Sequence, residues 1–479
     1  MLVRDTTGVM EAIGDLTNRL AIGIWVDVVG RLAWEGRTSV LASATYRRMG
    51  VSTATGSLSA APPTNALPLL TTLQAVRELS PAEAARGYPV RVSALVTYYD
   101  GYWGNAFVQD STAGIYVNCE GQELDLRHAQ KVEVEALTSS GGFAPEIIKP
   151  HFRILGDGKE PETKLIGPDQ ALTGHYDSQW SDAEGVVRSF NITWGHLRLD
   201  LVSGQSHFMA NLAGRWEGGG PTNLIDARVR IRGVCGAEVN QRRQLVGVTF
   251  FVPDLAHIVV QESAPADLSA LPLRALGEVQ QFQPNTTEGH RVRVRGVVTL
   301  QQPNGSLFIQ DPSGALEVKA RPDQPFRLGD QVEVVGFPSP GAHSPHLEDP
   351  LVQLLGSGTP PLPVLVSASQ VVGGSTNLES LDSRLIQLDA RVVNQITTAS
   401  DQTLVLDVNG QTFPAILMAD RPHLSIPILE PGGLLRITGV CCLEANQSSY
   451  VHAFSVRLRS ASDVSILQRP SWWTARHSL

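Results

Sequence analysis

Long apolar runs are missing from this sequence, and so is a leader-like segment at its start. No stretch of about 18 apolar residues occurs, so the sequence predicts no membrane-spanning helix. Arg4, Asp5 and Glu11 interrupt the apolar residues that a signal peptide would need near the N-terminus. If Met1 is the true start, the sequence alone predicts a soluble chain that is not exported.

Positive charge and cysteine are also scarce. The net charge is −9 at pH 7, whereas a protein that neutralises phosphates normally carries the opposite sign, so nucleic acid is not an expected partner. There are four cysteines and none shows C-x-x-C spacing, which argues against a zinc or redox motif. We expect all four to be buried apolar thiols: Cys119, Cys235, Cys441 and Cys442.

Catalytic signatures are absent as well. The glycine stretches at 218–220 and 373–374 match neither a phosphate-binding loop nor a dinucleotide fingerprint, and no hydrolase, metalloprotease or kinase motif occurs. The segment His343-Ser-Pro-His346-x-Glu348-Asp349 contains metal-ligand types, but its prolines and Gly341 predict a solvated loop. We therefore expect no enzymatic activity, no cofactor and no metal site.

The sequence has many turn-forming residues instead. It contains 44 glycines and 30 prolines among 479 residues, with 42% hydrophobic and 18% charged residues. This composition is typical of a folded, β-rich protein rather than a disordered one. The length exceeds what one hydrophobic core supports, so several domains are expected.

One pattern is written three times. Residues 107–110 read Phe-Val-Gln-Asp, residues 308–311 read Phe-Ile-Gln-Asp and residues 2–5 read Leu-Val-Arg-Asp. Each is followed by a V-x-V strand and by a glycine 45 or 46 residues after the aspartate. Spacings this regular indicate a repeat array. A small turn sequence follows each aspartate, so we expect structural turn carboxylates that accept backbone N–H bonds: Asp5, Asp110 and Asp311.

The repeat is best resolved between residues 71 and 160. Leu73, Val76 and Leu79 have helical spacing, and Ser80-Pro-Ala-Glu83 predicts a capping box. Five strands then follow, with a break between the third and the fourth. That count and order predict an OB-fold, a five-stranded Greek-key barrel, with an SH3-like barrel as the nearest alternative.

A second variant of the unit alternates with the first. Residues 182–189 parallel 388–395, and residues 229–240 parallel 435–446. We predict an all-β chain of tandem five-stranded OB-like barrels joined by short linkers and short helices. Its expected parts are a partial unit at 1–60, type A units at 71–160 and 271–358, type B units at 165–262 and 363–467, and a tail at 468–479.

Four aromatic residues cluster between the first two strands of the 71–160 unit: Tyr98, Tyr99, Tyr102 and Trp103. In OB-folds this loop borders the usual binding surface, where flat rings stack on bases or sugars. They are therefore the candidate ligand-binding residues. The alternative is that two of the rings pack against the neighbouring repeat. Arginines at 228, 230 and 232 alternate along a strand and predict a solvated face paired with acids.

The amino-acid sequences of several segments resemble those of a known family. YPVRVSALVTYYD, FVQDSTAGIYV and VEVEALTSSGGFAPEI, then QWSDAEGVVRS and LIDARVRIRGVCG, resemble the sensor region of large bacterial membrane-bound sensor histidine kinases of the acidobacterial type. In that family, tandem OB-like units lie outside the cytoplasmic membrane. The stretch SASDVSILQRPSWWTAR (460–476) resembles the segment just before the transmembrane helix, which implies a membrane-proximal position for Trp472 and Trp473.

The resemblance implies a non-catalytic region that senses an unknown extracellular ligand or protein for a two-component receptor, in the periplasm or outside the cell. It implies membrane contact only through a segment beyond residue 479. No phosphoacceptor or ATP-binding region is present in the sequence, so we expect a fragment of a kinase rather than a kinase. Two alternatives remain open: a structural spacer or protein-interaction array, and a binder of single-stranded nucleic acid or polysaccharide.

Overall fold

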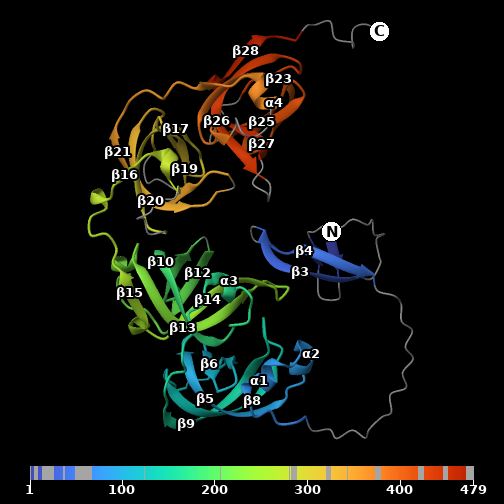
Figure 1. Ribbon diagram of the computed structural model, residues 1–479, viewed down its shortest axis with the longest axis vertical. Helices are drawn as coiled ribbons and strands as arrows, with labels where there is room; N and C mark the ends of the chain where they lie inside the picture. The colour runs from blue at the N-terminus through green and yellow to red at the C-terminus, as the bar shows by residue number, and fades with distance from the viewer. Residues whose placement is uncertain are drawn as a thin grey trace. The chain divides into compact units, whose positions relative to one another are not determined.

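The computed structural model consists mainly of rolled β-sheets (Figure 1). The chain divides into two compact units, Met1–Ala264 and Pro265–Leu479, and each is described by itself. Within the described residues, no helix is long and apolar enough to cross a membrane. The structure describes the backbone of 2–4, 9–12, 26–35 and 38–48, and residues 67–122, 124–204, 206–279, 281, 289–319, 325–341, 343–372, 379–418, 426–445 and 451–470.

The first complete barrel, barrel I, is a closed five-stranded barrel with the strand order β5-β6-β7-β9-β8. β7 and β9 pair in parallel, and the other neighbours are antiparallel, which is the Greek-key arrangement of an OB-fold. The all-β prediction of OB-like barrels is confirmed. The strands are β5 (Pro89–Asp100), β6 (Asn105–Gln109), β7 (Gly114–Asn118), β8 (Gln130–Ser139) and β9 (Glu146–Asp157).

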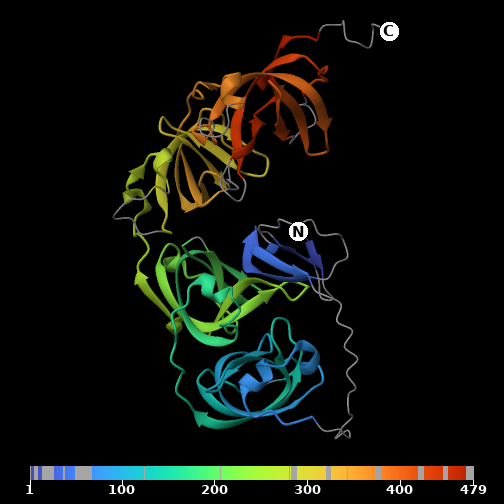
Figure 2. The ribbon, with the colours of Figure 1, turned by 45° about the vertical axis from the view of Figure 1, so that its right-hand side comes forward.

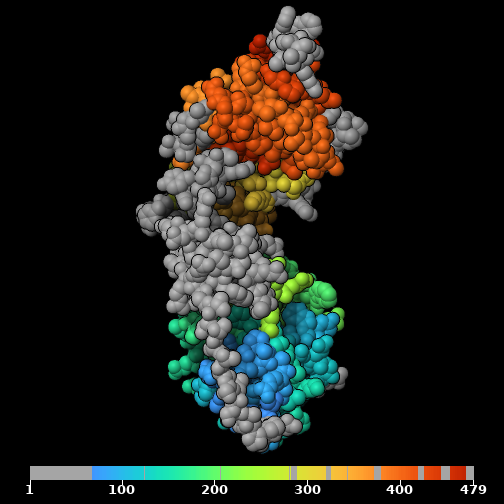
Figure 3. Space-filling model, turned by 90° about the vertical axis from the view of Figure 1, so that its right-hand side faces the viewer, coloured from blue at the N-terminus to red at the C-terminus, as the bar shows by residue number. Residues whose placement is uncertain are grey.

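Two short helices precede barrel I, α1 (Leu73–Arg77) and α2 (Pro81–Ala84). The predicted capping box is confirmed, since the Ser80 hydroxyl accepts from the Glu83 N–H and the Glu83 carboxylate accepts from the Ser80 N–H. Leu73 and Val76 are fully buried in the barrel core. The residues around these helices form the blue surface of barrel I in Figure 3.

Barrel II repeats this topology in the same compact unit. The order is β10-β11-β12-β14-β13-β15, and an additional β10–β13 pairing closes the sheet. Figure 2 shows the two rolled sheets from a second direction. Its elements are α3 (Pro168–Ala171), β10 (Gln179–Thr193), β11 (His196–Ser203), β12 (Ser206–Leu212), η1 (Thr222–Leu224), β13 (Arg228–Val239), β14 (Leu245–Val252), η2 (Leu255–His257) and β15 (Ile258–Glu262).

The second compact unit contains barrels III and IV. In both, the first and fourth long strands also pair, β17 with β20 and β23 with β26. Barrel III consists of η3 (Leu268–Ala270), β16 (Leu273–Arg274), η4 (Leu276–Glu278), β17 (Val292–Gln301), β18 (Leu307–Gln310), β19 (Ala315–Lys319), β20 (Gln331–Ser339) and β21 (His346–Gly356). Barrel IV consists of β22 (Val364–Leu365), α4 (Ala368–Val372), β23 (Leu385–Thr397), β24 (Asp401–Val408), β25 (Gln411–Met418), β26 (Leu434–Ala445), β27 (Val451–Leu458), η5 (Ala461–Asp463) and β28 (Val464–Gln468).

The prediction of a solvated loop around His346 is wrong. His346 begins β21 and is buried, and its Nε2 lies 3.0 Å from Oε1 of Glu348. The turn-forming residues end at Pro345, directly before the strand. Pairing with both β19 and β20 extends this end of the strand instead, so tertiary pairing overrides the local turn signal.

Four strands at the N-terminus form a separate sheet: β1 (Leu2–Arg4), β2 (Val9–Ala12), β3 (Val26–Glu35) and β4 (Thr38–Arg48). Their order, β1-β2-β4-β3, is the order of β6-β7-β9-β8 in barrel I, and β2 and β4 pair in parallel as β7 and β9 do. The sequence repeat at 2–5 thus corresponds to the same strand as Phe107–Asp110. Asp5, Trp472 and Trp473 lie outside the described residues.

Each complete barrel has its own hydrophobic core. In barrel I the core is built by alternation, since Val90, Val92, Ala94 and Val96 of β5 all point inward and are at most 4% exposed. Two further apolar clusters lie between consecutive barrels, one in each compact unit. These clusters define two junctions, one between barrels I and II and one between barrels III and IV.

Candidate functional site

The predicted aromatic cluster is divided between several environments. Tyr98 is fully buried outside the barrel core, with its ring 5.3 Å from that of Phe251 in barrel II. Tyr99 points to the other side of β5, packs against the core and donates its hydroxyl to the carbonyl of Leu124 at 3.0 Å. Adjacent residues of a strand face opposite ways, so these two tyrosines cannot share one platform.

Tyr102 and Trp103 lie on the β5–β6 tip. Trp103 stacks on His196 of barrel II with a centroid distance of 3.7 Å, whereas Tyr102 is 64% exposed and its ring lies 5.5 Å from the same histidine. The structure therefore places Tyr98 and Trp103 at the junction between barrels I and II, and leaves Tyr102 at its edge.

Asp100 connects the tip to barrel II. Its Oδ1 accepts from the backbone N–H groups of Tyr102 and Trp103 at 2.9 and 3.0 Å, which fixes the tip. Its Oδ2 lies 2.7 Å from Nε2 of His196 and accepts from the Gly214 N–H at 2.8 Å. Both the Asp100 and the His196 side chains are fully buried. Sequence reasoning missed this pair, although the Asp-Gly turn at 100–101 was a signal for the aspartate.

The repeated glutamine also acts across the junction. Oε1 of Gln109 accepts from the backbone N–H of Trp180 at 2.8 Å. In the other compact unit, Oε1 of Gln310 accepts from the backbone N–H of Leu385 at 2.9 Å. The two glutamines occupy the same place in the repeated motif. Each accepts a hydrogen bond from a backbone N–H at the start of the first long strand of the next barrel, β10 or β23. The repeat therefore encodes a junction as well as a barrel.

The repeated aspartate fixes a turn. Asp110 Oδ1 accepts from the N–H groups of Thr112 and Ala113 at 2.7 and 2.9 Å, and Oδ2 accepts from the N–H of Leu73 at 2.9 Å. Because Leu73 begins α1, the carboxylate also caps that helix. Burial tends to raise the pKa of Asp110, but these hydrogen bonds outweigh it and hold the pKa below its ordinary value.

Asp311 has the same environment in barrel III. Its Oδ1 accepts from the N–H groups of Ser313 and Gly314 at 2.7 and 2.8 Å, and its Oδ2 accepts from the N–H of Leu276 at 2.9 Å. Its pKa is likewise lowered by these bonds against the effect of burial. Two carboxylates with the same partners in two barrels are structural turn groups.

In the second barrel of each pair, an aspartate accepts a hydrogen bond from a backbone N–H. Asp177 Oδ1 accepts from the N–H of Ala237 at 2.9 Å, and Asp382 Oδ1 accepts from the N–H of Leu443 at 2.9 Å. The following residues, Ser178 and Ser383, both have positive φ. At the first junction Arg77 donates to Asp177 Oδ2 at 3.1 Å, so the helix segment of barrel I is tied to barrel II.

Barrel II covers the face of barrel I that OB-folds use for binding. That face comprises strands 2 and 3 and the loops that flank them. Tyr98, Phe107 and Tyr116 of barrel I pack there against Trp180 and Phe251 of barrel II. The corresponding cluster in the second unit contains Leu300, Phe308, Val440 and Cys442. The surface that would hold an oligonucleotide on barrel I is thus occupied by protein.

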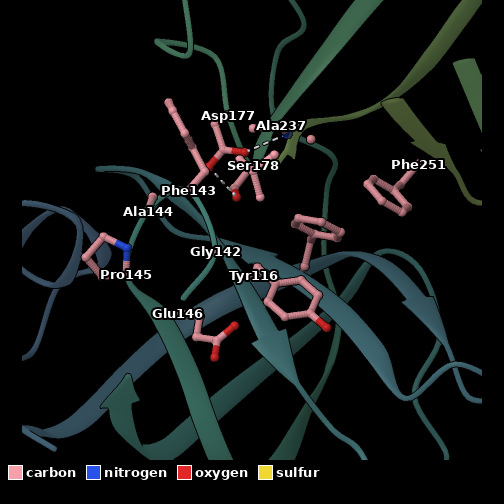
Figure 4. A pocket seen from close by; sticks show the side chains of 13 residues that line it. Tyr116, Gly142, Phe143, Ala144, Pro145, Glu146, Asp177, Ser178, Ala237 and Phe251 are labelled. Carbon is pink, nitrogen blue, oxygen red and sulfur yellow. Dashed lines mark hydrogen bonds between the residues drawn. The ribbon is translucent and has the colours of Figure 1, made fainter. Parts of the chain in front are cut away.

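A pocket of about 210 Å³ remains within the first junction (Figure 4). Four aromatic rings line it, from Phe107, Tyr116, Phe143 and Phe251. The loop of residues 142–146 forms one wall and the β13 residues Gly236 and Ala237 form another. Rings, a loop and a strand from two barrels therefore line one open pocket.

Two carboxylates face this pocket, Glu146 and Asp177. The oxygens of Asp177 are engaged by Ala237, Arg77 and Ser178, as Figure 4 shows in part. Glu146 is half-buried, and burial raises its pKa against the opposing effects of Ser139 and Arg243. Glu146 is the polar group best placed to receive a hydrogen bond from a ligand.

Two of the three arginines predicted to pair with acids on β13 do so, Arg230 and Arg232. Asp182 is fully buried and lies 2.7 Å from Arg230 and 2.9 Å from Arg232. Burial alone would raise the pKa of Asp182, but the two arginines lower it. These contacts stabilise the β10–β13 pairing and occupy the cations.

The four cysteines are free thiols. Cys119, Cys235 and Cys441 are buried and Cys442 is partly buried, which agrees with the expected apolar role. Burial raises the pKa of Cys119 and of Cys442 to about 12.

No family model matches this chain, and no curated protein matches it. Among solved structures, fission yeast Pot1 with single-stranded DNA matches at 11% identity and a TM-score of 0.22, covering 43% of this chain and 90% of that one. A murine DNA-binding protein bound to double-stranded DNA matches at 11% identity and a TM-score of 0.19, covering 38% and 98%. The p204 HINb domain matches at 10% identity and a TM-score of 0.17, covering 36% and 95%.

Proposed function

We propose that this chain is a non-catalytic binding region in which the junction between barrels I and II holds a compact ligand, as part of a bacterial sensor of the two-component type. The observation that carries the binding proposal is the ring-lined pocket with Glu146 at its wall. The signalling role and a location outside the cytoplasmic membrane rest on the sequence resemblance given above.

The pocket restricts the class of ligand. Its volume of about 210 Å³ lies below the roughly 300–1,000 Å³ of drug-sized sites. Aromatic walls favour an apolar or cationic body, since a ring face attracts a positive charge. Glu146 requires a hydrogen-bond donor. A small organic amine with an apolar part meets these conditions.

A single substitution distinguishes a ligand-binding pocket from a gap in the packing between barrels I and II. Ala237 lines the pocket, and Leu443 holds the corresponding position at the second junction. Ala237→Leu should fill the space and abolish binding, while the backbone bond to Asp177 is retained. Isothermal titration of the full chain with a panel of small amines and amino acids measures this. Glu146→Gln should weaken binding, with the exposed Glu135→Gln as its control.

The spacer hypothesis predicts the opposite result. If no compound binds the unmodified chain more tightly than the Ala237→Leu variant, the pocket is a packing gap and the proposal of a ligand site fails. The repeated junction itself favours the spacer as the second candidate, because the same backbone contacts join both pairs of barrels.

Nucleic-acid binding is the remaining alternative. A binder of single strands should lose affinity steeply with salt, in proportion to its phosphate contacts. We expect no retardation of a single-stranded oligonucleotide at low salt, because the chain is acidic and the binding face of barrel I is covered.

A further inference from the structure

Two histidines and a glutamate from three segments of the first compact unit converge at one point. His128 lies in the turn before β8 of barrel I, Glu160 lies in the connection to barrel II and His257 ends η2 of barrel II. Their ligand atoms lie within 4.8 Å of one another. Nε2 of His128 is 2.9 Å and Nε2 of His257 is 3.4 Å from the same oxygen, Oε1 of Glu160.

Nδ1, the other nitrogen of each histidine ring, already has a hydrogen-bond partner. Nδ1 of His128 lies 2.9 Å from the carbonyl oxygen of Thr97, which can only accept, so Nδ1 carries the proton. Nδ1 of His257 lies 2.8 Å from Oδ1 of Asp254, where a carboxylate is again the acceptor. In a neutral ring Nε2 then has a lone pair. Two such lone pairs directed at one carboxylate oxygen repel unless a positive charge lies between them.

We propose that His128, Glu160 and His257 bind one divalent transition-metal ion, with Zn²⁺ as the best fit, and that this ion joins barrels I and II. Two imidazoles and a carboxylate form a zinc donor set that leaves a fourth position for water. Bonds of about 2.0–2.2 Å in a tetrahedral site place neighbouring ligand atoms about 3.3 Å apart. The nitrogen-to-oxygen separations of 2.9 and 3.4 Å are close to this value.

The surroundings of the cluster resemble the outer shell of a metal site. Ligating histidines usually donate their second N–H to a carboxylate or a backbone carbonyl, and here Asp254 and Thr97 supply one of each. The indole of Trp180 fixes both rings, stacked on His128 at 5.0 Å and edge-on to His257 at 5.8 Å. Arg232 lies 3.8 Å from the far oxygen of Glu160 and is held mainly by Asp182, so it leaves Oε1 accessible.

No local sequence pattern predicts this site, because its members are far apart in the chain. Glu160 follows His128 by 32 residues and precedes His257 by 97. Pairing of β10 with β13 and of β13 with β15 brings η2 back beside the connection between barrels. The site lies apart from the ring-lined pocket, whose residues it does not share.

Titration of the EDTA-treated full chain with ZnCl₂ tests the proposal. We expect one tight site per chain, which His128→Gln and His257→Gln each weaken at least tenfold. His151→Gln, an exposed histidine of β9, should leave it unchanged and controls for adventitious binding. Asp254→Asn should weaken binding by about 10- to 100-fold, because it weakens the hydrogen bond behind His257, while the amide oxygen can still accept from the Ala256 N–H. MgCl₂ should give no such site.

A second readout guards against variants that fail to fold. Co²⁺ in place of Zn²⁺ should give the visible absorption of a tetrahedral site with nitrogen and oxygen ligands, and Glu160→Gln, which keeps the side-chain volume, should change that spectrum. Zinc affinity that is equal in the unmodified chain, His128→Gln and His257→Gln would overturn the proposal. Hydrogen bonds from the two rings to Glu160 would then account for the cluster without a metal.

Discussion

Replacing Asp110 by asparagine tests the role assigned to the repeated aspartate. The amide keeps one oxygen for the turn N–H groups of Thr112 and Ala113, but turns an N–H toward the N–H of Leu73. One charge-assisted bond is lost, worth about 1.5–3 kcal/mol, and the buried Leu73 amide is left without its acceptor. Some relaxation of the five-residue helix α1 offsets this, so we expect a loss of about 2–3 kcal/mol.

Tryptophan fluorescence can follow this loss in the full chain. Six of the eight tryptophans belong to the first compact unit, at 25, 34, 103, 180, 194 and 216, whereas the second has tryptophan only at 472 and 473. Barrels I and II together span roughly 200 residues, a size at which the melting temperature changes by about 2–4 °C per kcal/mol, so Asp110→Asn should lower the fluorescence transition by about 4–12 °C. Asp311→Asn is the matched control. It should lower a transition seen by circular dichroism and leave the fluorescence transition in place.

The pH dependence gives a second check with a defined sign. The folded pKa of Asp110 is below its ordinary value of 3.8, so the carboxylate stabilises the unit above that pH and loses this effect as pH falls through the folded pKa. The difference between the unmodified chain and Asp110→Asn should therefore be full at pH 7 and shrink below about pH 4. A difference under 1 °C at pH 7, or one that persists undiminished at pH 3, would refute the reasoning.

Two further predictions concern the junction and the thiols. Gly114→Ala should destabilise the first unit by about 1–3 kcal/mol in chemical denaturation, because the added Cβ would lie 1.9 Å from the carbonyl oxygen of Ser178. Gly167→Ala, with nothing within 4 Å, should cost much less, and equal losses would contradict the contact. The four cysteines should not react with a thiol reagent at pH 8 until the chain unfolds, since burial raises their pKa values. Fast labelling of the native protein would show that a thiol is exposed.

The sequence predicts what depends on local pattern. Alternating valines identify β5, and the Ser80–Glu83 capping box identifies α2, because both signals lie within a few residues. The turn role of Asp110 follows in the same way from the Ser-Thr-Ala-Gly after it. The helix cap on Leu73 does not, since 37 residues separate the two.

The site depends on contacts between distant residues. Gln109 and Trp180 are 71 residues apart, and Asp100 and His196 are 96 apart. Tyr98 and Tyr99 are adjacent and equally aromatic, so only the register of β5 against β6 and β8 decides which one enters the junction. Composition and motif spacing do not determine which face of β5 points toward the next barrel.

The two junctions differ in their side chains but share two kinds of bond to the backbone. Gln109 and Gln310 accept from backbone N–H groups, and so do Asp177 and Asp382. A backbone N–H is present whatever side chain the partner carries, so these bonds tolerate substitution at the partner. Apolar residues inside each junction can therefore change without altering how the barrels meet, and Tyr98 in one junction corresponds to Leu300 in the other. A framework of this kind allows one junction to hold a ring-lined pocket while the other has a cluster with a single aromatic ring, Phe308, among Leu300, Val440 and Cys442.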